Sequence, residues 1–176
     1  MIEPTYRTQL ERSAVLPSGQ SIRMRSPRLE DRSLFIEFGS RMAPEDLRLR
    51  FFTGVRTLTD DMMSRLVHID HKRDAALVAQ APDSEEILGV ASYLSDPATS
   101  EAEFAVMVRS DWKGHGVGWK LMKNLVALAR RRGVAKLTGI VLTENTNMLK
   151  FCRDLGFSIG HNQDDAATVT ASLSLT

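Results

Sequence analysis

Three glycines at alternate positions, Gly114, Gly116 and Gly118, form the stretch that most constrains how this chain can fold. They follow an apolar run at 102–108 and open a segment in which apolar residues recur with helical spacing. Glycine lets the backbone turn tightly and come close to a ligand. The first turn of a helix adds unpaired N–H groups and the positive end of the helix dipole. The pattern therefore predicts a strand, a loop and a helix that cradle an anion such as a pyrophosphate, with Lys113 as a cation at the edge.

Apolar periodicity in the rest of the chain predicts a mixed arrangement of strands and helices. Expected strands cover 21–25, 75–81, 87–94, 102–108 and 136–142, with two short ones near Ser158 and at 167–173. Expected helices begin at Ser26-Pro27, at the capping-box pattern 57–60, near Gly116 and at Asn145. Pro44 should end or interrupt the first of these helices. The order β-α-α-β-β-β-α-β-α-β-β predicts a mixed α/β domain with at least one right-handed crossover.

The composition is that of one globular domain without a strongly charged partner. The 176 residues are 43% hydrophobic and 26% charged, with a net charge of +1, which argues against nucleic-acid or membrane binding. One cysteine, Cys152, excludes an internal disulfide and fits a reducing cytoplasm. No apolar run reaches the ~18 residues of a membrane span. Residues 1–20 show no secretory signal, and their polar character suggests a loosely ordered leader before a domain at 21–176.

The glycine loop departs from two other phosphate-binding motifs. A dinucleotide fingerprint, Gly-x-Gly-x-x-Gly, counted from Gly114 places Trp119 at the last glycine position. A P-loop ends in Gly-Lys-Ser/Thr, a combination that this loop lacks. From the residues alone, the loop is either an anion cradle of another kind or a turn that only positions the next helix.

Two separated motifs resemble signatures of the GNAT N-acetyltransferase superfamily. Residues 113–118 resemble its Gln/Arg-x-x-Gly-x-Gly/Ala loop, which holds the pyrophosphate of acetyl-CoA. Residues 145–157 look like its Asn…Leu-Gly-Phe helix, and the element order from about Ser21 to Leu175 is similar as well. The resemblance implies a GNAT-like acyl-CoA N-acyltransferase fold, a mixed α+β sheet, with acetyl-CoA as co-substrate. It also implies cofactor contacts from Met107, Val108, Lys113, Gly114, His115, Gly116, Val117, Gly118 and Asn145.

Three further stretches resemble a particular group of enzymes within this superfamily. Residues 48–52, 75–79 and 102–108 are similar to the catalytic domain of bacterial Pat-type protein lysine acetyltransferases. The resemblance implies a protein lysine as acceptor, with acetyl-CoA as the other partner. Pat-type enzymes often carry a fused regulatory domain, and no such domain is recognisable in this sequence. Regulation, acyl-chain preference and oligomeric state therefore remain open.

Transfer to an amine requires a base, because a free lysine with a pKa of ~10.4 is mostly protonated at neutral pH. Glu103 is the candidate, since it is a charged residue within an apolar strand and shares a face with Ala105 and Met107. The resemblance places the catalytic glutamate of Pat-type enzymes on Glu103. The alternative is a solvated glutamate near the end of a strand. The backbone of 104–108 should face the pantetheine arm, with an N–H near Met107 as oxyanion donor.

Other polar residues have plainer interpretations. Asn145 caps its helix or contacts pantetheine, and His115 touches phosphate or faces solvent. Cys152 aligns with a tyrosine that protonates the leaving thiolate in many GNAT enzymes, but we expect a small buried residue there. His68 and His71 have no evident third ligand, so we expect no metal site.

The predicted function is transfer of an acetyl group from acetyl-CoA to a primary amine by direct attack, with protein lysine as the preferred acceptor. A small-molecule amine acetyltransferase and a non-catalytic acyl-CoA-binding regulatory module are the alternatives. Segment 47–66, expected on the acceptor side of the cleft, carries both acidic and basic residues, a mixed-charge rim that suits a protein surface: Arg48, Arg50, Arg56, Asp60 and Asp61. An ordinary pair of solvated helices would have a similar composition.

Overall fold

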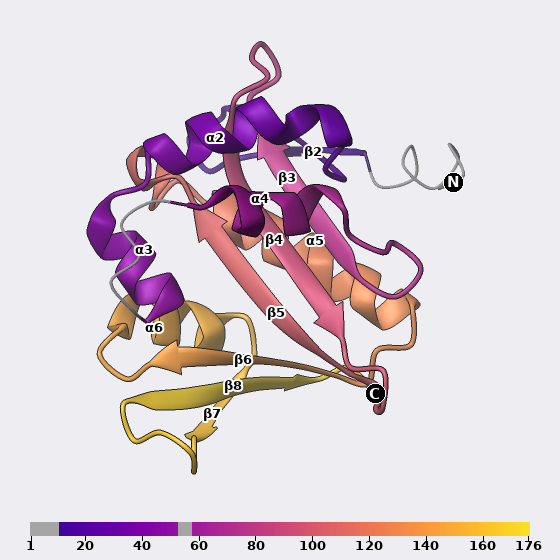
Figure 1. Cartoon of the computed structure of the whole chain (residues 1–176), viewed down its shortest axis with the longest axis vertical. Coiled ribbons are helices and arrows are strands. Elements are labelled where there is room, and N and C mark those ends of the chain that lie inside the picture. The colour runs from indigo at the N-terminus through magenta and orange to yellow at the C-terminus, as the bar shows by residue number, and fades with distance from the viewer. Residues whose placement is uncertain (1–10, 53–57) are drawn as a thin grey trace.

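One eight-stranded mixed sheet organises the protein, as a computed structural model shows for residues 11–52 and 58–176 (Figure 1). The strand order is β1-β2-β3-β4-β5-β6-β8-β7. Only β5 and β6 pair in parallel, and all other neighbours are antiparallel. The strands are β1 (Arg12–Val15), β2 (Ser21–Arg25), β3 (Ala75–Gln80), β4 (Ile87–Ser95), β5 (Glu101–Val108), β6 (Lys136–Leu142), β7 (Ser158–His161) and β8 (Thr168–Ser174).

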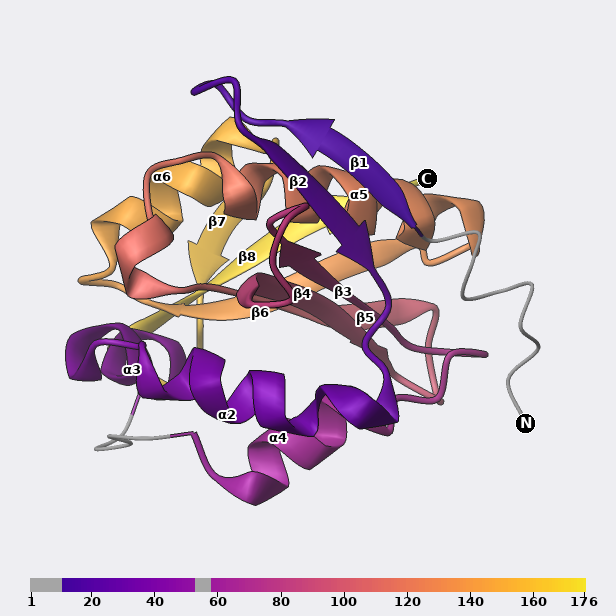
Figure 2. The same cartoon turned by 90° about the horizontal axis from the view of Figure 1, so that it is seen from above.

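Helices cover both faces of this sheet and so create two cores (Figure 2). Helices α5 (Val117–Arg131) and α6 (Thr146–Asp154) lie on one face. Helices α2 (Arg32–Ser40), α3 (Pro44–Phe51) and α4 (Asp60–Val67) lie on the other. The apolar stripe predicted for α5 is buried in the first core, which confirms its amphipathic pattern. Phe35, Phe38 and Leu47 form part of the second core.

The described fold begins before the boundary expected at residue 20. Strand β1 pairs with β2 from Arg12 to Val15, and the side chain of Leu16 is only 2% exposed. Gly19 closes the connecting turn with a φ of +87°, and the amide of Leu16 donates to the carbonyl oxygen of Gln20 at 2.8 Å. Strand β1 has only four residues and is mostly exposed, with Val15 facing solvent, so hydrophobic periodicity could not reveal this edge strand.

Helix α2 begins later than the Ser26-Pro27 signal predicted. A 3₁₀ turn at Leu29–Asp31 precedes it, and Ser26 caps no helix. The reason is a buried ion pair, in which the guanidinium of Arg25 binds both carboxylate oxygens of Asp31 at 2.7 and 2.8 Å. Asp31 also accepts the amide N–H of Arg28 at 2.7 Å. The buried charge of Arg25 needs this counter-charge, and the need outweighs the capping signal of Ser26-Pro27.

The next two helix starts differ in part from expectation. Pro44 does not interrupt α2, which has already ended at Ser40, but opens α3 at a position where its missing N–H costs nothing. Helix α4 is capped by Thr59, whose hydroxyl accepts the amide N–H of Met62 at 3.3 Å. Thr57, the other member of the expected capping pattern, lies outside the described residues.

The two parallel strands separate after three residue pairs. Strands β5 and β6 pair at Glu101–Lys136, Ala102–Leu137 and Glu103–Thr138, and within the described chain their ladder ends there. The ring of Phe104 occupies the vertex of this fork and packs on Phe157, with ring centroids 4.8 Å apart. Gly139 makes room for it, because a Cβ at this position would lie 2.6 Å from Phe104 Cε1. The fork opens a gap in the middle of the sheet.

Candidate active site

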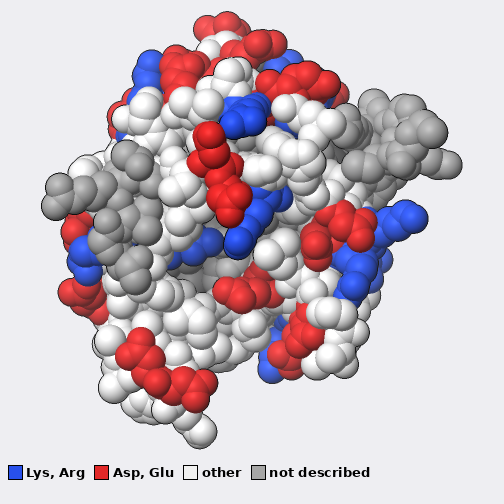
Figure 3. Space-filling model, viewed as in Figure 1, with Lys and Arg blue, Asp and Glu red and all other residues white. Residues whose placement is uncertain are grey.

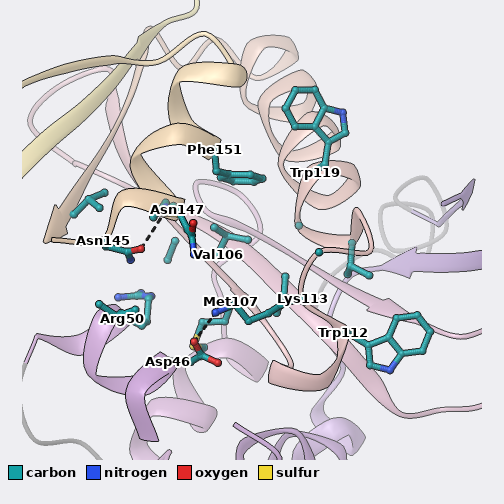
Figure 4. A pocket seen from close by; sticks show the side chains of 18 of the residues that line it. Asp46, Arg50, Val106, Met107, Trp112, Lys113, Trp119, Asn145, Asn147 and Phe151 are labelled. Atoms are coloured by element: carbon teal, nitrogen blue, oxygen red, sulfur yellow. Dashed lines mark hydrogen bonds and ion pairs between the residues drawn. The ribbon is translucent and has the colours of Figure 1, made fainter. Parts of the chain in front are cut away.

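A cavity of about 740 Å³ lies at this fork and reaches both faces of the sheet. Its walls include Leu49 and Arg50 of α3 on one face and Trp119 and Phe151 of α5 and α6 on the other. Figure 4 shows Asp46 and Arg50 projecting from below and Asn147 and Phe151 from above. A path through a sheet allows two reactants to meet from opposite sides.

The glycine loop forms one wall of the cavity, as its sequence predicts. Gly114 and Gly116 adopt φ values of +79° and +90°, a region that favours glycine. A Cβ on Gly116 would also lie 3.0 Å from Cδ of Pro17, so the turn between β1 and β2 presses on the loop. No side chain caps the start of α5 within the described structure. Its first N–H groups are therefore available to an anion, which fits a pyrophosphate.

Lys113 is held by an acidic partner that the sequence did not suggest. Its Nζ lies 2.6 Å from Oδ1 of Asp46, and the hydroxyl of Ser110 donates to Oδ2 of the same carboxylate at 2.5 Å. Asp46 belongs to α3, so the expected phosphate cation connects the loop to the opposite face of the sheet (Figure 4). In this arrangement the anion cradle relies on backbone N–H groups.

The aromatic residues beside the loop separate into two groups. His115 is exposed and does not line the cavity; its ring centroid lies 5.5 Å from that of Trp112. Trp119 and Phe151 do line the cavity, and their rings meet edge to face with centroids 6.4 Å apart. The phosphate contact considered for the exposed His115 side chain stays a prediction, while Trp119 and Phe151 form an apolar wall.

The open edge of β5 supplies the second wall. Phe104 to Val108, including the predicted Met107 and Val108, line the cavity beyond the last residue paired with β6. Backbone N–H and C=O groups along such an edge can bind an extended chain as an additional strand would. The pantetheine arm expected along this edge and the oxyanion donor expected near Met107 stay predictions.

Glu103 lies at the vertex of the fork. It is exposed and forms the last pair with β6, and the cavity lining begins at the next residue, Phe104. Its side chain lies on the same face of β5 as that of Met107, which packs on the core beneath α2, α3 and α4. Glu103 therefore faces the α3 side of the sheet, where its charge interacts with Arg50.

Arg50, one of the arginines of the mixed-charge segment 47–66, lines the cavity, a position that the sequence did not single out among them. Burial lowers the pKa of its guanidinium, and the neighbouring charge of Glu103 opposes this effect. Its guanidinium lies 4.9 Å from the centroid of the Phe51 ring. Periodicity could not single it out, because Arg48 and Arg50 look alike on a short charged helix. Arg48, in contrast, is occupied by Glu45 and by Glu144, at 2.6 and 2.5 Å.

Asn145 serves as the predicted helix cap and also borders the cavity. Its Oδ1 accepts the amide N–H of Met148 at 3.2 Å at the start of α6. Cys152, one helix turn beyond Met148, is fully buried and does not line the cavity. Burial raises the pKa of its thiol to about 11. The interpretation of Cys152 as a small packing residue is thus confirmed.

Within residues 11–52 and 58–176, every helix is too short or too polar to span a bilayer. In the same ranges, His, Cys, Asp and Glu side chains do not gather in a group that could hold a metal ion.

A forked mixed sheet, an uncapped helix after a glycine loop and an open strand edge define an acyl-CoA-dependent acyltransferase site. The chain matches the Acetyltransferase (GNAT) family over residues 43–157, and it belongs to this family. Its members transfer an acetyl group from acetyl-CoA to an amine, which establishes the present chain as a GNAT acetyltransferase. The glycine cradle and the open β5 edge fit this co-substrate.

Similar proteins extend over nearly the whole chain. The Acetyltransferase PA5475 of Pseudomonas aeruginosa is 28% identical over 162 residues, which cover 91% of this chain and 87% of the relative. The crystal structure of the GNAT domain of S. lividans PAT is 25% identical, with a TM-score of 0.87, and covers 96% of this chain and 99% of that domain.

A third structure shows the same fold with its cofactor. YncA from Salmonella typhimurium, an acetyltransferase described with acetyl-CoA, is 18% identical with a TM-score of 0.68 and covers 88% of this chain and 94% of that one.

Proposed function

We propose that this enzyme acetylates lysine side chains of proteins by direct attack on acetyl-CoA, with Glu103 as the general base. The position of Glu103 carries the proposal. It stands at the vertex of the fork, on the face opposite α5 and the glycine loop, where an acceptor amine would meet a thioester held along β5.

Proton removal follows from this position. An attacking lysine must first lose a proton that it holds with a pKa of ~10.4. The carboxylate of Glu103 is exposed, so it can take this proton directly or through one water molecule. Because the amine attacks the thioester itself, no residue of the chain has to carry the acetyl group.

The open edge of β5 supports the other half of the reaction. Acetyl-CoA supplies the thioester, and a backbone N–H near Met107 would donate to the carbonyl oxygen as negative charge develops on it. The buried Cys152 does not line the cavity, so we assign it no part in protonating the leaving group. A thiolate whose conjugate acid has a pKa of ~8.5 is readily protonated by water.

A protein acceptor is favoured by the character of the α3 face. This face carries side chains of both charges around a hollow (Figure 3), and mixed charge at a rim suits contact with another protein surface. The resemblance to Pat-type enzymes, together with the structural likeness to the GNAT domain of S. lividans PAT, supports the same acceptor class.

Replacing Glu103 by Gln tests the base. E103Q keeps the size of the side chain, so kcat should fall by ~10²–10⁴ while acetyl-CoA affinity stays unchanged. E101Q is the matched control, because Glu101 lies on the same strand and pairs with Lys136 at 2.7 Å. Steady-state rates and calorimetry separate the two effects. Wild-type turnover by E103Q would assign the base to another group.

The acceptor class requires a second experiment. A folded protein, its isolated lysine peptide and a free polyamine are offered as competing acceptors, and mass spectrometry measures acetylation of each. We expect the protein and peptide lysines to be modified. Efficient acetylation of the polyamine with neither protein nor peptide modified would favour a small-molecule enzyme.

A further inference from the structure

The side chain of Arg50 lines the cavity, and among the described residues no hydrogen-bond acceptor meets its guanidinium. The residue lines the cavity wall formed by α3, and Figure 4 shows its side chain opposite Asn145. Its Nε is buried, and no described residue accepts a hydrogen bond from it. A buried donor without an acceptor loses its hydrogen bonds to water and gains none in return, so an incoming acceptor would stabilise it.

Carboxylates satisfy other buried arginines of this protein. Arg25 binds Asp31 at 2.7 Å and Arg109 binds Asp111 at 2.7 Å. Within the described residues, Arg50 has no carboxylate inside the 4.0 Å ion-pair distance, and Glu103 acts on it only from farther away. A guanidinium in such a place can donate two parallel hydrogen bonds to the two oxygens of a carboxylate.

The location identifies which reactant would bring this carboxylate. The phosphates of acetyl-CoA fit the glycine loop at the start of α5, and its acetyl end carries no anionic group. Arg50 lies on α3, on the face to which Glu103 points, which is the acceptor side of the fork. The charge that meets Arg50 therefore belongs to the acceptor.

We propose that Arg50 binds a carboxylate of the acceptor and thereby selects amines that carry an acidic group nearby. This inference rests on the proposed function, in which the acceptor is a protein lysine. The carboxylate would then come from an acidic residue beside that lysine. In a free amino acid the same chemistry would come from its own carboxylate. Arg50 is in either case a specificity residue, distinct from the base at Glu103.

The test uses three peptides that differ only in the residue beside the target lysine, which is Glu, Ala or Arg. For the wild-type enzyme, kcat/KM should be roughly tenfold or more higher for the Glu peptide than for the Ala peptide, since a charge-assisted bond contributes that much. R50L should remove this preference, and R50K should retain part of it. R65L, which removes an exposed arginine on α4, is the control and should keep the preference.

Two results would overturn the inference. One is an equal kcat/KM of the wild-type enzyme for all three peptides. The other is a fall of kcat by the same factor for every acceptor in R50L, with KM unchanged, which would mean that Arg50 acts on Glu103 instead. Calorimetry with acetyl-CoA verifies that each variant is folded, because binding of this co-substrate does not involve Arg50 in the proposal.

Small amines separate this inference from the proposed function. 4-Aminobutyrate carries a carboxylate that butylamine lacks, and both amines are assayed with the same variants. Arg50-dependent preference for 4-aminobutyrate, with no peptide modified, would retain the carboxylate site and reject the protein acceptor. Acetylation of all peptides without preference would retain the protein acceptor and reject the carboxylate site.

Discussion

Replacing Gly139 by Ala should weaken both the fold and acetyl-CoA binding. Gly139 lies on β6 opposite the ring of Phe104, and an added Cβ would stand 2.6 Å from Cε1 and 2.8 Å from Cζ of that ring. Ordinary van der Waals contact begins at 3.4 Å. The ring must therefore move, but Phe157 packs on it with ring centroids 4.8 Å apart. The ring has room to move toward the cavity, because Phe104 forms part of the cavity wall.

The size of the effect follows from two opposing terms. Overpacking a core by one methyl group costs about 1–3 kcal/mol. Replacing glycine by alanine stabilises the folded state by about 0.4–1 kcal/mol, because it lowers the conformational entropy of the unfolded chain. The free energy of unfolding should therefore decrease by about 1–2 kcal/mol in G139A. Each kcal/mol lowers the Tm of a domain of this size by about 2–4 °C. A ring displaced into the cavity should also weaken acetyl-CoA binding.

Urea unfolding and calorimetry with acetyl-CoA measure these two effects. G160A is the matched control, because Gly160 is an exposed residue of β7 and a Cβ there would meet no atom within 4 Å. This control should unfold at the wild-type urea concentration or slightly above it. If G139A proves as stable as G160A and binds acetyl-CoA equally well, the vertex of the fork is not tightly packed and the reasoning fails.

Three further predictions concern the loop, the cap and the buried thiol. G116V should lose acetyl-CoA affinity, since Gly116 has a φ of +90° and a Cβ would lie 3.0 Å from Pro17 Cδ; unchanged calorimetric affinity in a folded variant would place the phosphates elsewhere. N145A should unfold with about 1 kcal/mol less free energy in urea, whereas N145D keeps the cap, and equal stability of both variants would contradict this role. C152A should retain most turnover, and a transfer-competent acetyl-thioester trapped on Cys152 would show otherwise. Burial raises the pKa of this thiol from 9.0 to about 11, so between these pH values the folded state keeps a proton that the unfolded state loses. The free energy of unfolding should therefore fall as pH rises from about 9 toward 11. C152A should show a smaller fall in urea titrations across that range, and an equal fall would assign the effect to other groups.

The candidate site was predictable where it depends on local backbone chemistry. Gly114 and Gly116 have the positive φ values that a tight loop before a helix demands. Asn145 caps α6, and Gly156 ends the same region with a φ of +93°. Each of these features requires a particular residue type for reasons that involve only its near neighbours in the chain. Sequence reasoning therefore located the loop, the α5 and α6 helices and the strand that bears Glu103.

Features that depend on distant partners escaped sequence reasoning. Asp46 holds Lys113 across 67 positions of the chain, and Arg50 acts on Glu103 from a helix on one face of the sheet. In each case the preference of one residue depends on a charge that only folding brings near.

The sequence by itself determined the class of site, because a glycine loop, a helix start and an apolar strand each depend only on residues close together in the chain. Only the tertiary structure decided where β5 and β6 separate, which side of the fork Glu103 faces and which arginine reaches the cavity. These properties arise from strand register and from the packing of α3 on the sheet, which no single segment encodes. Register moves every side chain of a strand together, so the position of a base or a cation at the fork is a property of the assembled sheet.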